Sequence, residues 1–459
     1  MEQLQEINNF LNKHFIQIND IDASETIAWN DSAGFEPIGG DLIQFTGHFN
    51  GNNYSISGLT INLPSNNYVG LFGYGKNAEF SNIVVKDVLI NGASYVGGIV
   101  GFANPAIIRD SFVSGDLLST GSYTGGIVGR IRLNPSSVES SHSIVHITAS
   151  GSDIGGLAGF SGTTIVNSSS KGEINGGNRT GGLVGWNNSG AIMKSFSNSI
   201  VIGKSEVGGL VGSNGSDGSG NVEIINSYST GNVNGDELVG GLLGRNWIDG
   251  GVKFSFSYGK VSGPLEIGGL LGINAGAIVS SYWNQDSLEI GVGSGASDGV
   301  IGLSTLQMKN DSAFYYMKEL DFENTWLLTE GYPALYWEDV EAIPLPNMEP
   351  PKSVNKIYPD IGADWIPIDT TFTWNKVEAD TYEVQISLNS NFETIILSEL
   401  NIEDTTFTLS GELNFGVNYH WRVRGINLAG NGEWSDTSSF KTEYALTQPV
   451  TLLPEDQAT

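Results

Sequence analysis

Two histidines, His142 and His146, have the i, i+4 spacing with which a helix can hold zinc. Ser143 stands where a zinc peptidase would carry its glutamate general base, and the segment 141–148 is typical of a β-strand. On a strand these histidines lie on one face about 13 Å apart, too far to share one ion. We therefore expect no zinc catalysis here.

A second group of possible ligands places oxygen-bearing side chains at alternate positions, namely Asp217, Ser219, Asn221 and Glu223. Such oxygens suit calcium, so Asp217, Asn221 and Glu223 form a weak calcium candidate. The helix-loop-helix context of the common calcium loop is missing, which favours a solvated turn. Apart from this calcium candidate, we expect no cofactor.

Aromatic residues flanked by small ones recur along the chain, and they could stack on sugar rings. The column consists of Phe112, Phe196, Tyr228, Phe256 and Tyr282. His142 and Ser169 interrupt it. Because side chains alternate along a strand, inward serines would turn these rings outward. Packing in the core or under loops is the favoured alternative, because aromatic side chains are large hydrophobic groups first.

Motifs of covalent catalysis, phosphate binding and dinucleotide binding do not stand in the strand-to-helix context they need. The clustered basic and acidic groups that a polysaccharide lyase needs do not recur either. The sequence thus favours a protein that is not an enzyme.

The dominant pattern is a Gly-Gly-Leu-Val-Gly motif with eight copies, spaced 26 to 32 residues apart. The copies start at Gly70 (a shorter Gly-Leu-Phe-Gly version), Gly97, Gly125, Gly155, Gly181, Gly208, Gly240 and Gly268. Each repeat holds about three short extended runs and no helical period. Units this small bury a continuous core only by stacking, so the repeats predict a right-handed parallel β-solenoid.

We expect the glycines and the recurring asparagines of the repeat to have structural roles. We expect the motif glycines to turn corners that need positive φ and to let neighbouring coils approach closely. Asn187, Asn214, Asn246 and Asn274 occupy one position in four successive copies. Stacked asparagines can hydrogen-bond along a solenoid, and we favour this ladder over a polar ligand surface.

Composition limits the partners. The 459 residues include 21 Lys and Arg against 50 Asp and Glu, a formal net charge of −29, and no cysteine. This charge disfavours nucleic acid and anionic membranes, and no stretch approaches 18 apolar residues. The first residues lack the features of a signal peptide. We expect a fragment of a longer secreted protein, located outside the cell or on its surface.

The repeats resemble the GLUG-motif repeats of bacterial surface and secreted proteins. Similar segments precede them, such as Phe45-Thr46-Gly47-His48-Phe49-Asn50-Gly51, and follow them, such as Gly302-Leu303-Ser304-Thr305-Leu306. The resemblance covers roughly residues 1 to 345, and it implies a β-solenoid and a cell-surface setting but no chemistry.

These patterns divide the chain into five parts. We expect an N-terminal cap with first strands at 1–68, GLUG-type repeats at 69–300 and a C-terminal cap at 301–345. A short helical stripe of Leu4, Ile7, Phe10 and Leu11, and a helix within 304–320, would form the caps. A further domain at 346–445 and the truncated start of another module at 446–459 follow.

The domain at 346–445 has alternating strands at sandwich spacing, which predicts two packed antiparallel sheets. It resembles a fibronectin type III domain. Trp374 matches the core tryptophan of such domains, and Leu413 and Tyr419 match the tyrosine corner, in which the hydroxyl bonds the backbone. There is no Arg-Gly-Asp sequence.

Together these features predict a non-catalytic bacterial surface or secreted protein with a structural and adhesive role. The solenoid would form a rod and the fibronectin-like domain a spacer. A glycan or a protein on a host or neighbouring cell would be the partner, along with further modules of the same chain. The alternative is a carbohydrate-binding accessory region of a larger secreted enzyme.

Overall fold

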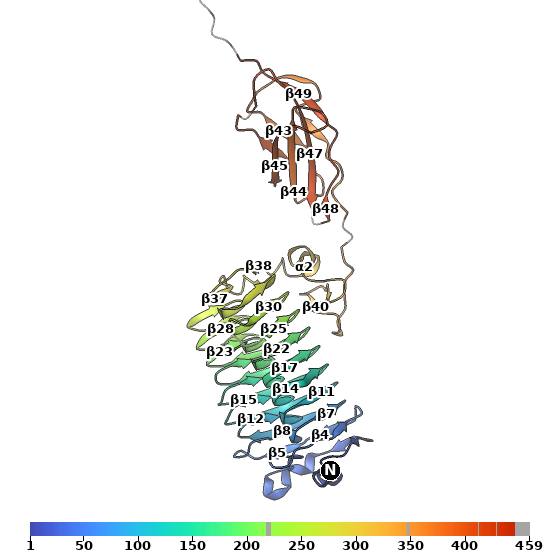
Figure 1. Cartoon of the computed structure of the whole chain (residues 1–459), viewed down its shortest axis with the longest axis vertical. Coiled ribbons are helices and arrows are strands. Elements are labelled where there is room, and N and C mark those ends of the chain that lie inside the picture. Colours follow the sequence, from blue (N-terminus) through green and yellow to red (C-terminus); the bar gives the residue numbers. More distant parts are fainter. Residues whose placement is uncertain (217–221, 347–348, 412, 428, 446–459) are drawn as a thin grey trace, which may run out of the picture. The chain divides into compact units, whose positions relative to one another are not determined.

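The computed structural model describes residues 1–216, 222–346, 349–411, 413–427 and 429–445. The chain divides into two compact units, Met1–Leu345 and Pro346–Thr459. In the first unit, coils stack one on the next from the N-terminus to β37 and β38, the yellow arrows of Figure 1. The prediction for residues 446–459 lies outside the described residues.

Three sheets, here named A, B and C, form the sides of the stack. The 17 strands of sheet A are β1 Phe15–Ile16, β3 His48–Asn50, β6 Phe72–Gly75, β7 Ala78–Ser81, β10 Val100–Ala103, β11 Ala106–Arg109, β14 Val128–Glu139, β17 Ala158–Val166, β20 Val184–Asn187, β21 Ala191–Met193, β24 Val211–Asn214, β25 Val222–Ile225, β29 Leu243–Asn246, β30 Gly250–Lys253, β34 Leu271–Asn274, β35 Ala277–Val279 and β37 Val292–Gly295.

Sheets B and C complete each coil. The 14 strands of sheet B are β2 Ile21–Asp22, β4 Ser55–Ser57, β5 Thr60–Asn62, β8 Val84–Gly92, β12 Phe112–Ser119, β15 His142–Ala149, β18 Ser169–Asn175, β22 Phe196–Ile202, β26 Tyr228–Ser229, β27 Val233–Asn234, β31 Phe256–Ser257, β32 Val261–Ser262, β36 Ser281–Asn284 and β38 Val300–Leu303. The seven strands of sheet C are β9 Val96–Gly97, β13 Thr124–Gly125, β16 Ile154–Gly155, β19 Thr180–Gly181, β23 Ser205–Gly208, β28 Glu237–Gly240 and β33 Leu265–Gly268.

The strand pairs in these three sheets are parallel and join residues one repeat apart, as in Val100 with Val128. The motif's paired apolar residues, such as Leu183 and Val184, are fully buried in a core that runs through the stack. This bears out the parallel β-solenoid, with about eight turns, that the repeat predicts.

The role predicted for the motif glycines is half right. Their φ angles are not in the left-handed region, so a need for positive φ does not explain them. Close approach does explain them, because a Cβ on Gly97 would lie 2.3 Å from the Val100 carbonyl oxygen. One on Gly126 would lie 2.2 Å from the carbonyl oxygen of Gly156 in the next coil. The backbone leaves no room for a side chain.

The asparagine ladder is present. The side-chain amide of Asn187 donates to Asn214 at 2.8 Å, Asn214 donates to Asn246 at 3.0 Å, and Asn246 donates to Asn274 at 2.9 Å. All four side chains are buried, so each bond satisfies a group that water does not reach. The structural role that we favoured for this column is therefore confirmed.

The N-terminus begins with α1 Glu2–Gln5 and a 3₁₀ turn, Glu6–Asn9. Leu4 and Ile7 are buried as predicted, but the helical stripe ends one residue before Phe10, whose side chain is 54% exposed. Two more 3₁₀ turns, Ser24–Ala28 and Asn30–Ser32, precede the first full coil.

After the last coil, the chain forms α2 Asn310–Tyr316, within the predicted helical stretch, and an antiparallel pair, β39 Trp326–Leu327 and β40 Ala334–Leu335. We name residues 304–343 the strap. No helix in the described part of the chain is long and apolar enough to cross a membrane.

The second unit holds a three-stranded and a six-stranded sheet over one core, in which Phe372 and Trp421 meet edge to face at 4.8 Å. The strands are β41 Lys356–Tyr358, β42 Ala363–Ile366, β43 Thr371–Trp374, β44 Thr381–Ser387, β45 Ile395–Ile402, β46 Thr406–Thr408, β47 Asn418–Asn427, β48 Gly430–Asn431 and β49 Ser438–Thr442.

The larger sheet is mixed and not wholly antiparallel, because β42 runs parallel to β49. The hydrogen bond predicted for the tyrosine corner is present, since the Tyr419 hydroxyl accepts the Asn414 N–H at 3.0 Å. Trp374 is buried in the core as predicted.

Candidate functional site

The serines beside the predicted aromatic column fix its direction. Ser227 Oγ donates to the Ile225 carbonyl at 2.9 Å and accepts the Ser195 N–H of the preceding coil at 3.2 Å. On the other side of Tyr228, Ser229 Oγ donates to the Gly241 carbonyl inside the coil at 2.5 Å. Both serines are buried, so the ring between them points out of the solenoid.

The column on sheet B is one continuous row in the strand register, and we name it the covered column. It consists of Phe112, His142, Ser169, Phe196, Tyr228, Phe256 and Tyr282. Neighbouring rings stack, with centroids 5.0 Å apart for Phe196 and Tyr228 and 4.9 Å for Tyr228 and Phe256.

The strap lies over much of this column. Tyr228, Phe256 and Tyr282 are 6%, 0% and 1% exposed and share an apolar cluster with the strap. Trp326, which is fully buried, packs on Phe256 with ring centroids 5.2 Å apart. Three of the five predicted sugar-stacking rings are therefore out of reach of a ligand, and packing under loops, the favoured alternative, describes them.

A carboxylate of the strap binds the end of one ring. The Tyr228 hydroxyl donates to Glu338, whose carboxylate oxygens both lie 2.9 Å away. Burial raises the pKa of Glu338, although the Leu335 N–H and the Tyr228 hydroxyl favour its charged form. Burial and the nearby Glu338 carboxylate both raise the pKa of Tyr228. These groups form a buried polar contact inside an apolar cover.

Ser169, which interrupts the row, leaves a gap that the strap fills. The Trp337 ring enters it, with its centroid 5.2 Å from His142 and 5.5 Å from Phe196. Its indole N–H donates to the Lys194 carbonyl at 2.8 Å. Since coils repeat at about 4.8 Å, Trp337 occupies the place that a ring at position 169 would take. Phe112 and Phe196 are half-buried.

The other predicted ligands are not brought together. His142 and His146 lie on one strand, β15, as predicted, and burial lowers the pKa of His142. Asp217 and Asn221 lie outside the described residues, while Glu223 pairs with Lys253 at 2.5 Å. The described residues hold no group of three or more His, Asp or Glu side chains that could bind a metal ion.

A second aromatic surface, which the sequence did not reveal, lies where sheets A and C meet, and we name it the open face. Its strand column pairs in register through Tyr74, Phe102, Arg130, Phe160, Trp186, Ser213, Arg245 and Ile273. Its corner column is Tyr68, Tyr95, Tyr123, Asp153, Arg179, Glu206, Leu238 and Glu266. Most of these side chains are half-buried by their neighbours.

The corner column has an uncommon backbone. All eight residues have φ between +50° and +70°, a region that costs residues other than Gly, Asn and Asp about 1–2 kcal/mol, so Asp153 alone of the eight tolerates it. A second corner, between sheets A and B, has the same conformation but carries mostly Asn, Asp and Ser, which tolerate it. Its residues are Asn82, Asp110, Ser140, Asn167, Lys194, Asn226, Phe254 and Ser280. Large side chains are therefore kept on the open face against backbone preference, which points to a use for them.

The N-terminal half of the open face is a stack of flat groups. The rings of Tyr68 and Tyr95 are 4.9 Å apart and nearly parallel, and those of Tyr95 and Tyr123 are 5.0 Å apart. The Arg130 guanidinium continues the stack, 4.7 Å from the Tyr123 centroid and 4.5 Å from that of Phe160. Its buried Nε has no hydrogen-bond partner among the described residues.

Charged pairs continue the corner column. Arg179 pairs with the buried carboxylate of Asp153, and its guanidinium lies 4.7 Å from the Trp186 ring. Burial raises the pKa of Asp153 although Arg179 opposes the rise. Glu206 lies 3.4 Å from Arg245, which sits 3.7 Å from the Trp247 ring. Each cation thus rests on an indole beside an anion.

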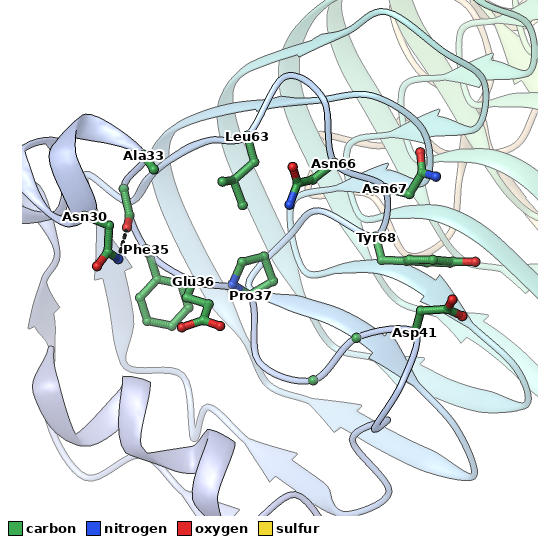
Figure 2. A pocket seen from close by; sticks show the side chains of 13 residues that line it. Asn30, Ala33, Phe35, Glu36, Pro37, Asp41, Leu63, Asn66, Asn67 and Tyr68 are labelled. Atoms are coloured by element: carbon green, nitrogen blue, oxygen red, sulfur yellow. Dashed lines mark hydrogen bonds between the residues drawn. The ribbon is translucent and has the colours of Figure 1, made fainter.

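Two cavities open on this face. One of about 450 Å³ lies at the N-terminal end, where Tyr68, Asp41, Pro37 and Asn66 are seen around it in Figure 2. The other, of about 410 Å³, is lined by Arg179, Trp186, Asn188, Glu206, Ser213, Ser216 and Trp247. Cavities that combine aromatic walls with a few polar groups are typical binding sites.

A sequence signal for this face exists. Each corner residue stands two positions before the first glycine of its motif, as Tyr68, Tyr95 and Tyr123 do. Counting back from the motif would have revealed the three tyrosines. The strained backbone that makes them informative is visible only in the structure.

These observations define a parallel β-solenoid with one aromatic row covered and another open. No protein-family model matches the chain. Over 106 residues it is 38% identical to a Gly-rich membrane protein of Evansella cellulosilytica, covering 21% of this chain and 12% of that protein. Over 108 residues it is 36% identical to Halomucin of Haloquadratum walsbyi, covering 22% of this chain and 1% of Halomucin.

The chain thus matches about an eighth or less of the length of these two relatives. They support a distant relationship over about a fifth of the chain. The GLUG and fibronectin type III assignments stay predictions.

Proposed function

We propose that this chain is a non-catalytic structural and adhesive part of a protein that acts outside a bacterial cell or on its surface. The solenoid is a stiff support, because each coil is hydrogen-bonded to the next along three sheets. The domain at 346–445 serves as a spacer. The open face contacts a glycan or a protein on a host or neighbouring cell.

The observation that carries this proposal is the open face itself. Eight successive positions have a backbone that suits glycine or asparagine better, and seven of them, all but Leu238, carry an aromatic or charged side chain. Half-buried tyrosines, tryptophans and arginines are the side chains most enriched where proteins bind partners. The distant relatives include one named a membrane protein, which agrees with a surface setting.

A binding experiment with the full chain tests the proposal. Labelled protein is applied to bacterial and host cells and to a glycan array, and Tyr95→Ala and Arg130→Ala are compared with Ile144→Ala. Ile144 is the matched control, because it is an exposed apolar residue on sheet B, away from the open face. We expect the first two variants to lose binding and the control to keep it.

Two results would count against this function. Equal binding by all three variants would show that the open face is not the binding surface. Hydrolysis of a polysaccharide or peptide library that one carboxylate substitution abolishes would show an enzyme.

The second candidate function is a carbohydrate-binding accessory region of a larger secreted enzyme. The two cavities on the open face favour it, because both combine an aromatic wall with amides and carboxylates. Binding to purified polysaccharide without binding to cells would favour this function over adhesion.

A further inference from the structure

The cavity between Trp186 and Trp247 results from one small residue in a row of large ones. The strand register places Ser213 between Trp186 of the preceding coil and Arg245 of the next. The large side chains on the two sides of this serine are about two coil spacings apart, roughly 10 Å, and the small Ser213 side chain takes up little of the space between them. We name this cavity, lined by the seven residues given above, the Ser213 slot.

The covered column shows what such a gap accepts. There Ser169 is also a serine between larger rings, and the flat indole of Trp337 fills its gap, between His142 and Phe196. Both gaps stand at a serine between larger side chains, but they differ in what lies over the serine. The strap supplies a ring for the first. In the second, Trp247 lies against Arg245 and its indole reaches the buried Ser213, and a cavity of about 410 Å³ remains beside Trp186 and Trp247.

The walls of the Ser213 slot are held in place. The indole N–H of Trp186 donates to the Gly215 carbonyl at 2.9 Å, and that of Trp247 donates to Ser213 Oγ at 3.0 Å. Arg179 lies against the Trp186 ring and Arg245 against that of Trp247. A site whose walls are fixed before binding loses little conformational entropy when a ligand enters.

One polar group in the slot lacks a partner. Glu206 Oε1 faces Arg245, but Glu206 Oε2 is buried without a hydrogen-bond partner among the described residues, and the side chain is only 15% exposed. Leaving such an acceptor unpaired is unfavourable, so a ligand that brings a donor to this carboxylate gains from it. Asn188 and Ser216 add an amide and a hydroxyl.

We propose that the Ser213 slot binds one neutral pyranose unit of a glycan, with an apolar ring face against the indole walls and a hydroxyl donating to Glu206 Oε2. A sugar ring combines an apolar face with hydroxyl donors around its edge, and this matches the lining. The phenylalanine side chain of a protein partner would fill the space but leave Glu206 unpaired. An anionic sugar would be repelled by the Glu206 carboxylate. The inference rests on the proposed function, because it names a ligand for the open face.

The test measures binding of the full chain to a panel of neutral oligosaccharides, namely glucans, mannans, galactans and N-acetylglucosamine oligomers, by calorimetry. Glu206→Gln keeps the shape of the side chain but turns the acceptor into an amide. Ser213→Trp brings a second indole beside that of Trp247 and should close the remaining cavity. Glu266→Gln is the matched control, because Glu266 lies in the same corner column, outside the cavity, and accepts from Ser294 at 2.9 Å.

We expect a member of the panel to bind, and Glu206→Gln and Ser213→Trp each to weaken it at least about tenfold, with Glu266→Gln unchanged. If Ser213→Trp does not fold, Glu206→Gln decides alone. Glycan binding that both variants leave intact would overturn the proposal that the Ser213 slot is the sugar site. Cell binding that depends on Arg130 but not on Glu206, with no neutral sugar bound, would overturn the slot and leave the proposed function standing.

A further outcome is capture of peptides with exposed aromatic side chains in place of sugars. That result would overturn the sugar proposal, since it would show a slot for a protein partner.

Discussion

The covered column on sheet B and the open face where sheets A and C meet are built alike, but only the first is covered by another segment of the chain. Both are rows of outward side chains, one from each coil, with rings about 5 Å apart. The strap buries one row beneath Trp326 and Trp337, while the other stays half-exposed. Outward direction alone therefore does not make an aromatic row a binding surface, because distant chain segments decide whether it is covered.

The largest expected difference between the two rows is in stability. Trp326→Ala removes a fully buried indole from between the strap and Phe256, and we expect a loss of about 3–5 kcal/mol in the free energy of unfolding. Denaturant unfolding of the full chain, followed by the near-ultraviolet signal of the solenoid, measures it. A loss below about 1 kcal/mol would mean that the strap is not firmly docked.

The gap at Ser169, which Trp337 fills, gives the next largest effect, and the effect of a substitution there on stability changes sign when Trp337 is absent. Ser169→Phe alone forces a second ring into the place of Trp337 and should cost about 1–3 kcal/mol. In a Trp337→Ala protein the same change fills an empty slot and should restore stability. A double-mutant cycle in denaturant measures the coupling. Additive effects would show that Trp337 does not occupy the slot.

The open face should contribute less than the covered column to the free energy of unfolding. Trp186 is half-buried and has no strap above it, so Trp186→Ala should cost about 1 kcal/mol, well below the cost at Trp326. The same unfolding experiment compares the two. Equal losses at Trp186 and Trp326 would remove the distinction between a row kept for stability and one kept for contact.

The smallest effect concerns pH. Because burial raises the folded-state pKa of Glu338, its contribution to stability is full below its ordinary value near 4.3 and is lost as pH rises through the raised value. Glu338→Gln cannot titrate, so the variant should gain stability relative to the wild type between pH 4 and pH 7. Melting temperatures across this range check it. A constant difference would show that Glu338 does not titrate under the strap.

The solenoid could be predicted because its information is local and repeated. One motif every 28 residues or so sets the strands, the close glycine contacts and the asparagine ladder, and all three are found. The strap could not be predicted in the same way. Its contacts join residues far apart, such as Trp337 and Lys194, and they follow no period.

The candidate site could be predicted from the sequence only in part. The interruption at Ser169 is plain in the sequence, but only the structure shows what fills it. The tyrosines of the open face stand at a fixed distance from the motif, yet a tyrosine looks ordinary until its φ is known to be positive. Ser213 looks like any other serine until the register places it between Trp186 and Arg245.

Hydroxyl-radical footprinting of the native full chain, read by mass spectrometry, tests the difference between the two rows most directly. We expect Tyr95, Tyr123 and Trp186 to be oxidised readily, and Tyr228, Phe256 and Tyr282 to be protected until the protein unfolds. Similar oxidation of both groups in the native protein would contradict the account, because it would show that the strap leaves the predicted aromatic column open.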